Sequence, residues 1–539
     1  MHLLAVFQSP RNIFTPFFGW LEQATYRIIN VDPSSEMDWK TYAKALVGFN
    51  VIGFIFLFGL LMFQSYLPFN PQHFPGLAWP LAFNTAVSFV TNTNWQAYAG
   101  ETTLSYGSQM LGLTVQNFLS AATGNAVLLA FIRGITRQSK ETIGNFWSDL
   151  TKTIVYVLLP FSIIIGILLA SQGVIQTVNS YVTVTTLQGD LQTIPLGPVA
   201  SQVAIKQLGT NGGGFFQANS AHPFENPNPL TYFLEALSIL LIPAASAYMY
   251  GLMLKKPKNG RMFYAVMFAF LIISTCSAVF FETQGNPHLD NGPYMEGKEV
   301  RSGVYDSIQW GVATTATSNG SVNAMHDSFT PISGGITLLL MMLGEVVYGG
   351  VGVGMCGMLM YGILTIFLVG LMVGRTPEFE GKKIQRSEIQ WVIVAILTPS
   401  ALILLGSGFT SVYAGAQASL GNKGPHGLTE ILYAFSSAAG NNGSAFAGLN
   451  ANTNYFNIVL GLIMIIGRVA VLIPSLAIAG TLAKKISSPP SAGTIPTSNF
   501  FFGLLLFSVI CIVGALTFFP ALALGPIIEE LLMVKGKFF

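Results

Sequence analysis

The chain has 539 residues, of which 51% are hydrophobic and 9% are charged, and its formal net charge is +2. Because a soluble domain carries about 25% charged residues, this composition excludes an ordinary soluble protein. The small net charge gives no support to nucleic-acid binding, and the three cysteines lie in apolar runs, which gives no support to a disulfide framework.

The first forty residues contain a short and interrupted apolar segment. Residues 1–20 include Pro10, Arg11, Asn12 and Pro16, which argue against the uninterrupted apolar core of a signal peptide. After this segment, about nine apolar runs are long enough to span a bilayer, and they predict an all-α polytopic membrane protein. The runs lie at 41–63, 105–132, 147–171, 229–254, 262–281, 331–373, 389–414, 455–482 and 500–524.

One of these runs, 331–373, is too long for a single straight crossing. Its middle, residues 344–354, is rich in glycine and contains Glu345, Gly349 and Gly350, so it predicts a broken helix. Unwound backbone at membrane depth is tolerated only where protein buries it or water lines it. We therefore expect the break beside a permeation path, where it could act as a barrier or gate.

Four short motifs rich in Asn and small residues recur roughly 110 to 125 residues apart, a spacing that predicts internal repeats. These filter motifs are 91–94, 210–213, 318–321 and 441–444, and each follows a segment of about half a membrane span, at 76–90, 198–209, 303–317 or 427–440. A ring of backbone carbonyls that replaces a cation's hydration shell is one basis of a selectivity filter, and glycine gives its strands the freedom to turn. The candidate K⁺-binding residues are Asn92, Thr93, Asn94, Gln96, Asn211, Gly212, Gly213, Asn319, Gly320, Asn442 and Gly443.

The order of span, pore helix, filter motif and span predicts four pseudo-repeats around a central pore. Their expected bounds are 41–133, 134–261, 262–388 and 389–485, with an N-terminal segment at 1–40 and an additional span and tail at 486–539. Loops between successive repeats carry most of the basic residues, for example Arg133, Lys255 and Arg375. Because basic loops favour the cytoplasmic side, the filters are expected to face the outside.

A few charged residues stand out beside these motifs. Glu101, Glu225 and Asp327 follow the first three motifs and could form an acidic vestibule that concentrates cations, although ordinary loop charges remain the alternative. Arg468 lies inside a strongly apolar run, where an unpaired cation costs at least about 2.5 kcal/mol. It could be an electrostatic barrier below the filter, or a structural partner of a carbonyl or of an acid such as Glu345.

The segments 89–96, 209–216, 218–227, 323–328 and 442–446 closely resemble the potassium-binding A subunit of the bacterial and archaeal Kdp potassium-transporting ATPase. The resemblance implies a superfamily of potassium transporters, usually with ten spans. It implies three partner subunits, namely a P-type ATPase B subunit, a C subunit and often a small F subunit. It also implies that the complex lies in the plasma membrane, where this chain contacts membrane lipids. It also implies that the filter captures external K⁺ and that a tunnel delivers the ion to the B subunit, while Arg468 and the break close the direct exit. Thr93 is then read as standing where the other motifs have glycine.

No nucleotide-binding or phosphorylation motif is recognisable, so the sequence gives no catalytic site and no covalently bound cofactor, and any energy for transport is expected from a partner. His222 and His326 could suggest a metal site, but each follows an Asn by three residues, which favours a shared loop structure. The alternative function is a stand-alone potassium channel or symporter of the Trk, Ktr or HKT kind, because these proteins share the arrangement of four pore loops.

Overall fold

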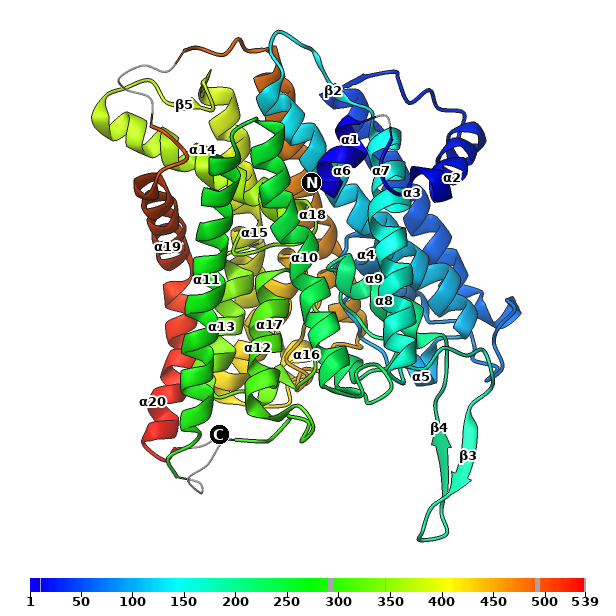
Figure 1. Cartoon of the computed structure of the whole chain (residues 1–539). Coiled ribbons are helices and arrows are strands. Elements are labelled where there is room, and N and C mark those ends of the chain that lie inside the picture. The colour runs from blue at the N-terminus through cyan, green and yellow to red at the C-terminus, as the bar shows by residue number, and fades with distance from the viewer. Residues whose placement is uncertain (10, 289–293, 345, 490–494, 538–539) are drawn as a thin grey trace.

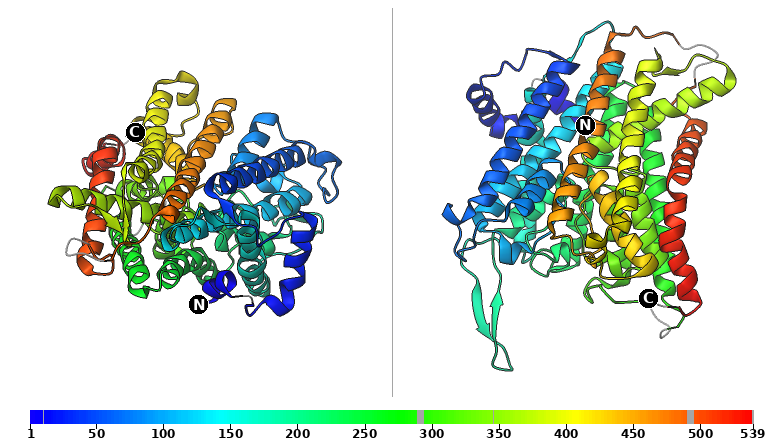
Figure 2. Two further views of the ribbon diagram at one scale, coloured as in Figure 1. Left: turned by 90° about the horizontal axis from the view of Figure 1, so that it is seen from above. Right: turned by 180° about the vertical axis from the view of Figure 1, so that it is seen from behind.

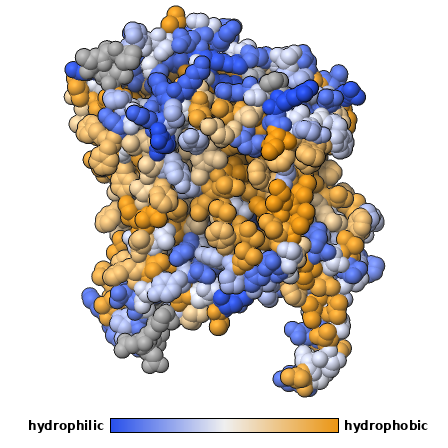
Figure 3. Space-filling model, in the orientation of Figure 1, coloured by the Kyte–Doolittle hydropathy of each residue, from blue (hydrophilic) through white to orange (hydrophobic). Residues whose placement is uncertain are grey.

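The fold is an all-helical bundle with an apolar belt between two polar ends. The structure is a computed structural model that describes residues 1–9, 11–288, 294–344, 346–489 and 495–537. Within these ranges, 9 helical stretches are long and apolar enough to cross a membrane, which confirms the predicted number. The space-filling view shows hydrophobic residues around the middle of the molecule and hydrophilic residues at its two ends (Figure 3).

The membrane-spanning stretches agree closely with the predicted runs. Short 3-10 or π turns are labelled η, and three of the stretches contain a π turn. The stretches are α3 (Trp39–Met62), η2–α6 (Ser108–Thr114 and Val115–Thr136), α7–η3–α8 (Phe146–Thr153, Ile154–Leu158 and Leu159–Ser171), α10 (Pro229–Met253), α11 (Pro257–Gln284), α14 (Val353–Val373), α15 (Arg386–Val412), α18 (Asn454–Lys484) and α19–η6–α20 (Phe500–Leu522, Ala523–Ile527 and Ile528–Val534).

Four shorter helices lie between these spans, and each leads into one filter motif. They are α4 (Trp79–Val90), α9 (Val199–Leu208), α12 (Gly303–Ala316) and α17 (Gly424–Ala439). Most of their residues are buried, although each helix is too short to cross a bilayer. They therefore act as pore helices, as the half-length segments in the sequence predicted.

The remaining elements are short. The N-terminal residues form α1 (His2–Gln8) and α2 (Thr15–Ile28). Three two-stranded antiparallel sheets pair β1 with β2, β3 with β4 and β5 with β6, and the β3–β4 hairpin projects from the end of the molecule that holds α20 (Figure 1). The other short elements are β1 (Met37–Asp38), β2 (Thr142–Gly144), β3 (Val182–Thr185), β4 (Leu191–Ile194), β5 (Glu378–Phe379), β6 (Lys382–Lys383), η1 (Gln64–Tyr66), α5 (Gly100–Thr103), η4 (Asn219–Ala221), η5 (His326–Ser328) and α16 (Ala414–Gln417).

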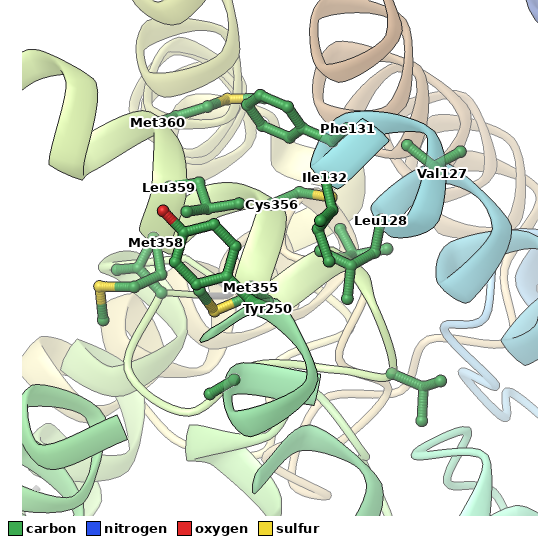
Figure 4. Close-up of a cluster of buried hydrophobic side chains, with 14 of the residues drawn as sticks. Val127, Leu128, Phe131, Ile132, Tyr250, Met355, Cys356, Met358, Leu359 and Met360 are labelled. Atoms are coloured by element: carbon green, nitrogen blue, oxygen red, sulfur yellow. The ribbon is translucent and has the colours of Figure 1, made fainter. Parts of the chain in front are cut away.

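The longest uninterrupted helix among the described residues, α18, lies at the centre of the bundle and packs on α6, α15 and α4. Figure 2 shows it between the N-terminal helices on one side and the C-terminal helices on the other. A second part of the core forms where α6 meets α14 and α10. There the buried side chains of Phe131 and Ile132 point towards Met360 and Cys356 of α14 (Figure 4).

The predicted broken helix is confirmed. Helix α13 (Pro331–Met342) ends, and α14 begins at Val353 after a break segment whose described residues, 343–344 and 346–352, are not helical. Gly344, Gly349 and Gly352 have φ values of +80°, +76° and +79°, which glycine adopts without the steric penalty that a Cβ atom brings. Glu345, which the sequence suggested as a partner of Arg468, lies outside the described residues.

A buried lysine joins two helix ends at the pole opposite the hairpin. Lys382 of β6 donates to the carbonyls of Gly134 at 2.8 Å and Leu482 at 2.7 Å, and also to that of Arg137. Because α6 ends at Thr136 and α18 at Lys484, the first two carbonyls belong to last helical turns, whose carbonyls lack partners within the helix. A cation at this position also interacts favourably with both helix dipoles.

We predict that Lys382→Met destabilises the protein. Methionine keeps the apolar stem but leaves the buried carbonyl of Gly134 unsatisfied, at about 1–3 kcal/mol, whereas that of Leu482 still accepts from the N–H of Lys485. The measurement is the thermal unfolding midpoint of the detergent-solubilised protein. Lys383→Met is the matched control, because this neighbouring side chain is exposed and should change little. Equal midpoints for the two variants would contradict the assignment.

Candidate ion-binding filter

The four filter motifs share one backbone pattern. Two residues after the end of each pore helix, the chain reaches a left-handed position: Asn92, Thr210, Ser318 and Asn441 have φ values of +64°, +46°, +50° and +48°. Two residues further on, a second left-handed position follows, at Asn94, Gly212, Gly320 and Gly443, with φ values of +52°, +78°, +87° and +107°. The four strands therefore have the same local conformation, although their sequences differ.

This pattern corrects the alignment of the first motif. Thr93 does not stand where the other motifs have glycine. Instead, Asn94 occupies the glycine position, and Thr93 corresponds to Asn211, Asn319 and Asn442. The shift by one residue has a physical reason, because asparagine enters the left-handed region more readily than other residues that carry a Cβ atom.

Three of the four joints between neighbouring strands depend on glycine. A Cβ atom on Gly212 would lie 1.8 Å from the carbonyl oxygen of Asn319, and one on Gly320 would lie 2.2 Å from that of Asn442. A Cβ atom on Gly443 would lie 2.0 Å from the carbonyl oxygen of Thr93. The second motif thus contacts the third, the third contacts the fourth, and the fourth contacts the first.

The joint between the first and second motifs uses side chains. Asn94 donates to the carbonyl of Gly212 at 2.8 Å. The Gln96 amide donates to the carbonyl of Gly214 at 2.8 Å and accepts from its N–H at 2.9 Å. These bonds close the ring, so the four motifs surround one axis in the order of the chain.

The other asparagine side chains also bind neighbouring repeats. Asn319 donates to the carbonyl of Lys206 at 3.1 Å, and Asn442 donates to that of Thr314 at 3.0 Å. Asn211 donates to the Asn92 side chain at 2.5 Å, and all of these groups are buried. The amide N–H groups are therefore occupied in holding the ring together. The oxygen ligands that the geometry offers are backbone carbonyls and the buried side-chain oxygens of Asn94 and Asn211, which accept no hydrogen bond from the described residues.

A cavity of about 520 Å³ lies above the ring. Its walls include Asn94, Gly213, Gly320 and Gly443, one residue from each motif, so it is the mouth of the filter. The described residues that line it include no Asp, Glu, Lys or Arg. The mouth is thus polar but uncharged.

The three predicted vestibule acids are absent from the walls of this mouth. Glu225 is completely buried and forms an ion pair with the equally buried Lys206, so its charge is already neutralised. Glu101 accepts from the N–H of Gln217 at 2.8 Å, and Asp327 accepts from the N–H of Gly448 at 3.1 Å. The alternative of structural loop charges therefore describes these acids better.

The break segment lies directly beneath the filter. The N–H of Val351 donates to the Thr210 hydroxyl at 2.9 Å, at the base of the second motif. The N–H of Gly349 donates to the carbonyl of Ala316 at 2.8 Å, at the end of pore helix α12. On the other side, Gly352 approaches the carbonyl of Gly124 in α6 so closely that a Cβ atom would lie 2.3 Å from it.

Arg468 of α18 lies next to this segment and is 6% exposed. Its guanidinium donates to the carbonyl of Ser120 in α6 at 3.4 Å, and the Ser120 hydroxyl donates to the Asn92 side chain at 2.9 Å. One side chain therefore separates this cation from the first filter motif. Of the two roles considered from the sequence, contact with a carbonyl is observed, and this contact is compatible with a barrier.

Sequence reasoning missed Lys206, although a lysine inside a pore helix with an acid in the following loop is a recognisable signal. Its ammonium also donates to the Asn219 side chain at 2.8 Å, so it connects the second pore helix to the loop after the filter. The structural interpretation of the two histidines fits the geometry. His222 stacks on Phe216 with ring centroids 3.9 Å apart, and burial lowers the pKa of His326, which bonds the Tyr433 hydroxyl at 2.8 Å, to about 3.

The fold and the filter place the chain in the class of polytopic membrane proteins with four pore loops around one axis. Among solved structures, it is similar to the potassium transporter TrkH from Vibrio parahaemolyticus, with a TM-score of 0.52 and 14% identity. This similarity covers 87% of the present chain and 92% of TrkH, and it concerns the fold alone.

Residues 1–531 match the family described as "Potassium-transporting ATPase A subunit". The chain is 52% identical to the potassium-transporting ATPase potassium-binding subunit of Leptospira interrogans, over 99% of both chains. It is also 52% identical to the subunit of the same name from Pseudomonas aeruginosa, over 98% of this chain and 94% of that one. The chain therefore belongs to the family of potassium-transporting ATPase A subunits, whose name describes one part of a multi-subunit complex.

We predict that Gly320→Ala weakens K⁺ binding. The new Cβ atom would meet the Asn442 carbonyl, and relieving the overlap costs about 1–3 kcal/mol, or roughly 5- to 150-fold in K⁺ affinity. The measurement is K⁺ titration of the purified protein. Gly48→Ala is the control, because a Cβ atom there meets nothing within 4 Å. Unchanged affinity in Gly320→Ala would contradict the close contact between the strands.

We also predict that Lys206→Met strongly destabilises the protein, because it leaves Glu225 buried without its partner, at about 3–5 kcal/mol. Adding Glu225→Gln to Lys206→Met should restore much of the decrease in the thermal unfolding midpoint. In the Lys206→Met/Glu225→Gln double variant, which removes both charges, the ionic-strength dependence of K⁺ binding should stay as in the parent protein. A changed salt dependence would restore the vestibule role that the structure argues against.

Proposed function

We propose that this chain binds external K⁺ in the four-motif filter and is the translocating subunit of an ATP-driven, high-affinity potassium uptake complex. The observation that carries this proposal is the closed ring of backbone strands, each preceded by a pore helix. The C-terminal ends of the pore helices carry partial negative charge and lead into the ring, so they favour a cation at its centre. Carbonyl oxygens can then replace the hydration shell of the ion.

The pathway below the filter supports sideways delivery. The break segment and Arg468 lie beneath the ring, where a bare K⁺ would meet both packed backbone and a fixed positive charge. A small cavity of about 60 Å³ adjoins the fourth motif, and its walls include Asn441, Gly344, Pro399 and Thr517. We infer that the ion leaves the filter through this region, between α13, α15 and α19, towards a tunnel that a partner subunit continues.

The proposed partners are a P-type ATPase B subunit, a C subunit and a small F subunit, in the plasma membrane. The proposed units of the chain are the four repeats at 41–133, 134–261, 262–388 and 389–485. The filters are placed on the outer side, because the loops that contain Arg133, Lys255 and Arg375 lie between repeats and basic loops favour the cytoplasm.

The second candidate is a stand-alone channel or symporter, which the TrkH-like fold keeps under consideration. The two functions make opposite predictions for liposomes that contain this chain alone. A coupled subunit should give no sustained K⁺ flux without its ATPase partner, whereas a channel should give flux down a K⁺ gradient. Flux at channel rates from the isolated chain would therefore reject the proposed coupling.

We predict that Arg468→Met uncouples ATP hydrolysis from uptake in the assembled complex, because it removes the positive charge beneath the filter. The expected result is a lower ratio of K⁺ transported to ATP hydrolysed, measured with both quantities in the same proteoliposomes. Arg468→Lys, which keeps the charge, should retain more of the coupling. If both variants couple as the parent does, Arg468 has a structural role only.

A further inference from the structure

A cluster of titratable side chains outside the filter has no role in the proposed transport pathway. It lies where η5, the start of α17 and α20 meet, at the same end of the molecule as the filter mouth. Asp327 comes from η5, His426 and Glu430 from α17, and Glu529 from α20. One ligand atom from each of Asp327, His426 and Glu430 can be chosen so that all three lie within 4.8 Å of one another.

The imidazole of His426 is held at both nitrogens. Its Nε2 lies 3.1 Å from Asp327 Oδ1, and its Nδ1 lies 2.7 Å from Glu529 Oε1. A metal-binding histidine usually donates its other ring N–H to a carboxylate, which fixes the ring and its tautomer. With Nδ1–H directed to Glu529, Nε2–H donates to Asp327 Oδ1, and a metal ion at Nε2 would take the place of this proton.

The two remaining carboxylates face one small space. A Cβ atom built on Gly448 would lie 2.5 Å from Glu430 Oε1 and 2.6 Å from Asp327 Oδ2, so both oxygens crowd around this glycine. The Glu430 carboxylate is fixed by the N–H groups of Gly421 and Asn422, both at 3.1 Å. The cluster combines three carboxylates with one imidazole, and such an excess of negative charge favours a bound cation.

Solvent can reach the cluster. Asp327, His426 and Glu529 line a cavity of about 530 Å³ that also contains Tyr294 and Lys537 in its walls. An ion in this cavity therefore has a route to Asp327 and His426, whereas Glu430 is fully buried and does not line it. The cavity differs from the filter mouth, since Asn94, Gly213 and Gly320 do not line it.

We propose that Asp327, His426 and Glu430 bind one divalent transition-metal ion, for which Zn²⁺ is the best match, and that Glu529 positions His426. One imidazole and two carboxylates are ligands that Zn²⁺ accepts, at about 2.0–2.2 Å, in a tetrahedral site whose ligand atoms are roughly 3.3 Å apart. The separation of His426 Nε2 and Asp327 Oδ1 fits this geometry. A bound ion connects the loop after the third filter motif to the fourth pore helix.

The test is Zn²⁺ titration of the full chain, purified in detergent, treated with a chelator and followed by calorimetry and by zinc content after gel filtration. We expect saturable binding of one Zn²⁺ per chain. His426→Gln and Asp327→Asn should each weaken it at least about 100-fold, and Glu529→Gln should weaken it by about 10- to 100-fold, as for other residues that orient a metal ligand. His73→Gln, which changes an exposed histidine elsewhere in the chain, should bind as the parent does.

Several results would overturn the site. These are the absence of saturable binding, parent-like affinity in His426→Gln, or displacement of Zn²⁺ by equal concentrations of Mg²⁺ or Ca²⁺, which would exclude an imidazole ligand. In any of these cases the cluster is an ion-paired contact between α17 and α20. If His426→Gln fails to fold, Asp327→Asn decides the question. The K⁺ affinity of the filter is a separate measurement, so failure here leaves the proposed transport function untouched.

Discussion

The close approach of glycine backbone to a neighbouring carbonyl is the constraint on which the rest of the structure depends. At Gly212, Gly320 and Gly443, no side chain larger than hydrogen fits between adjacent strands. These contacts fix the distance of each strand from the common axis, and that distance determines whether carbonyls can surround an ion. The pore helices, the buried asparagine amides and α18 all hold the strands at this separation.

The described residues that line the filter mouth include no acidic side chain. The buried acids that contact the second pore helix are each held by a partner. Lys206 neutralises Glu225, and Glu235 accepts from the side chains of Gln207 and Ser220. Cation preference at the mouth then rests on carbonyl and helix dipoles, which are fixed in direction and need no counter-ion. A strongly acidic mouth would attract divalent cations as well. A neutral ring of carbonyls instead selects an ion by replacing the oxygens of its hydration shell.

Much of this architecture could be predicted from local patterns. The spans, the pore helices and the break at 343–352 follow from hydropathy and glycine content, which are properties of short stretches of chain. The register of the first motif could not be predicted in this way, because Asn94 adopts the left-handed conformation that glycine adopts in the other three motifs. The role of Glu225 could not be predicted either, since its partner Lys206 is brought to it by the fold. The cluster around His426 is further still from local prediction, because its members come from segments about 100 residues apart in sequence, joined only by tertiary packing.

The contact between α18 and α6 has a consequence for how the protein is made. No loop links these two helices in sequence, and their junction is formed by packing, such as that of Gly134 against Ala479, together with the Lys382 bonds at their ends. During synthesis the ring likewise remains open on one side until the fourth motif, which contacts both the third and the first, has been made. Up to that moment the first three motifs form no closed ring, and the nascent protein has no complete filter.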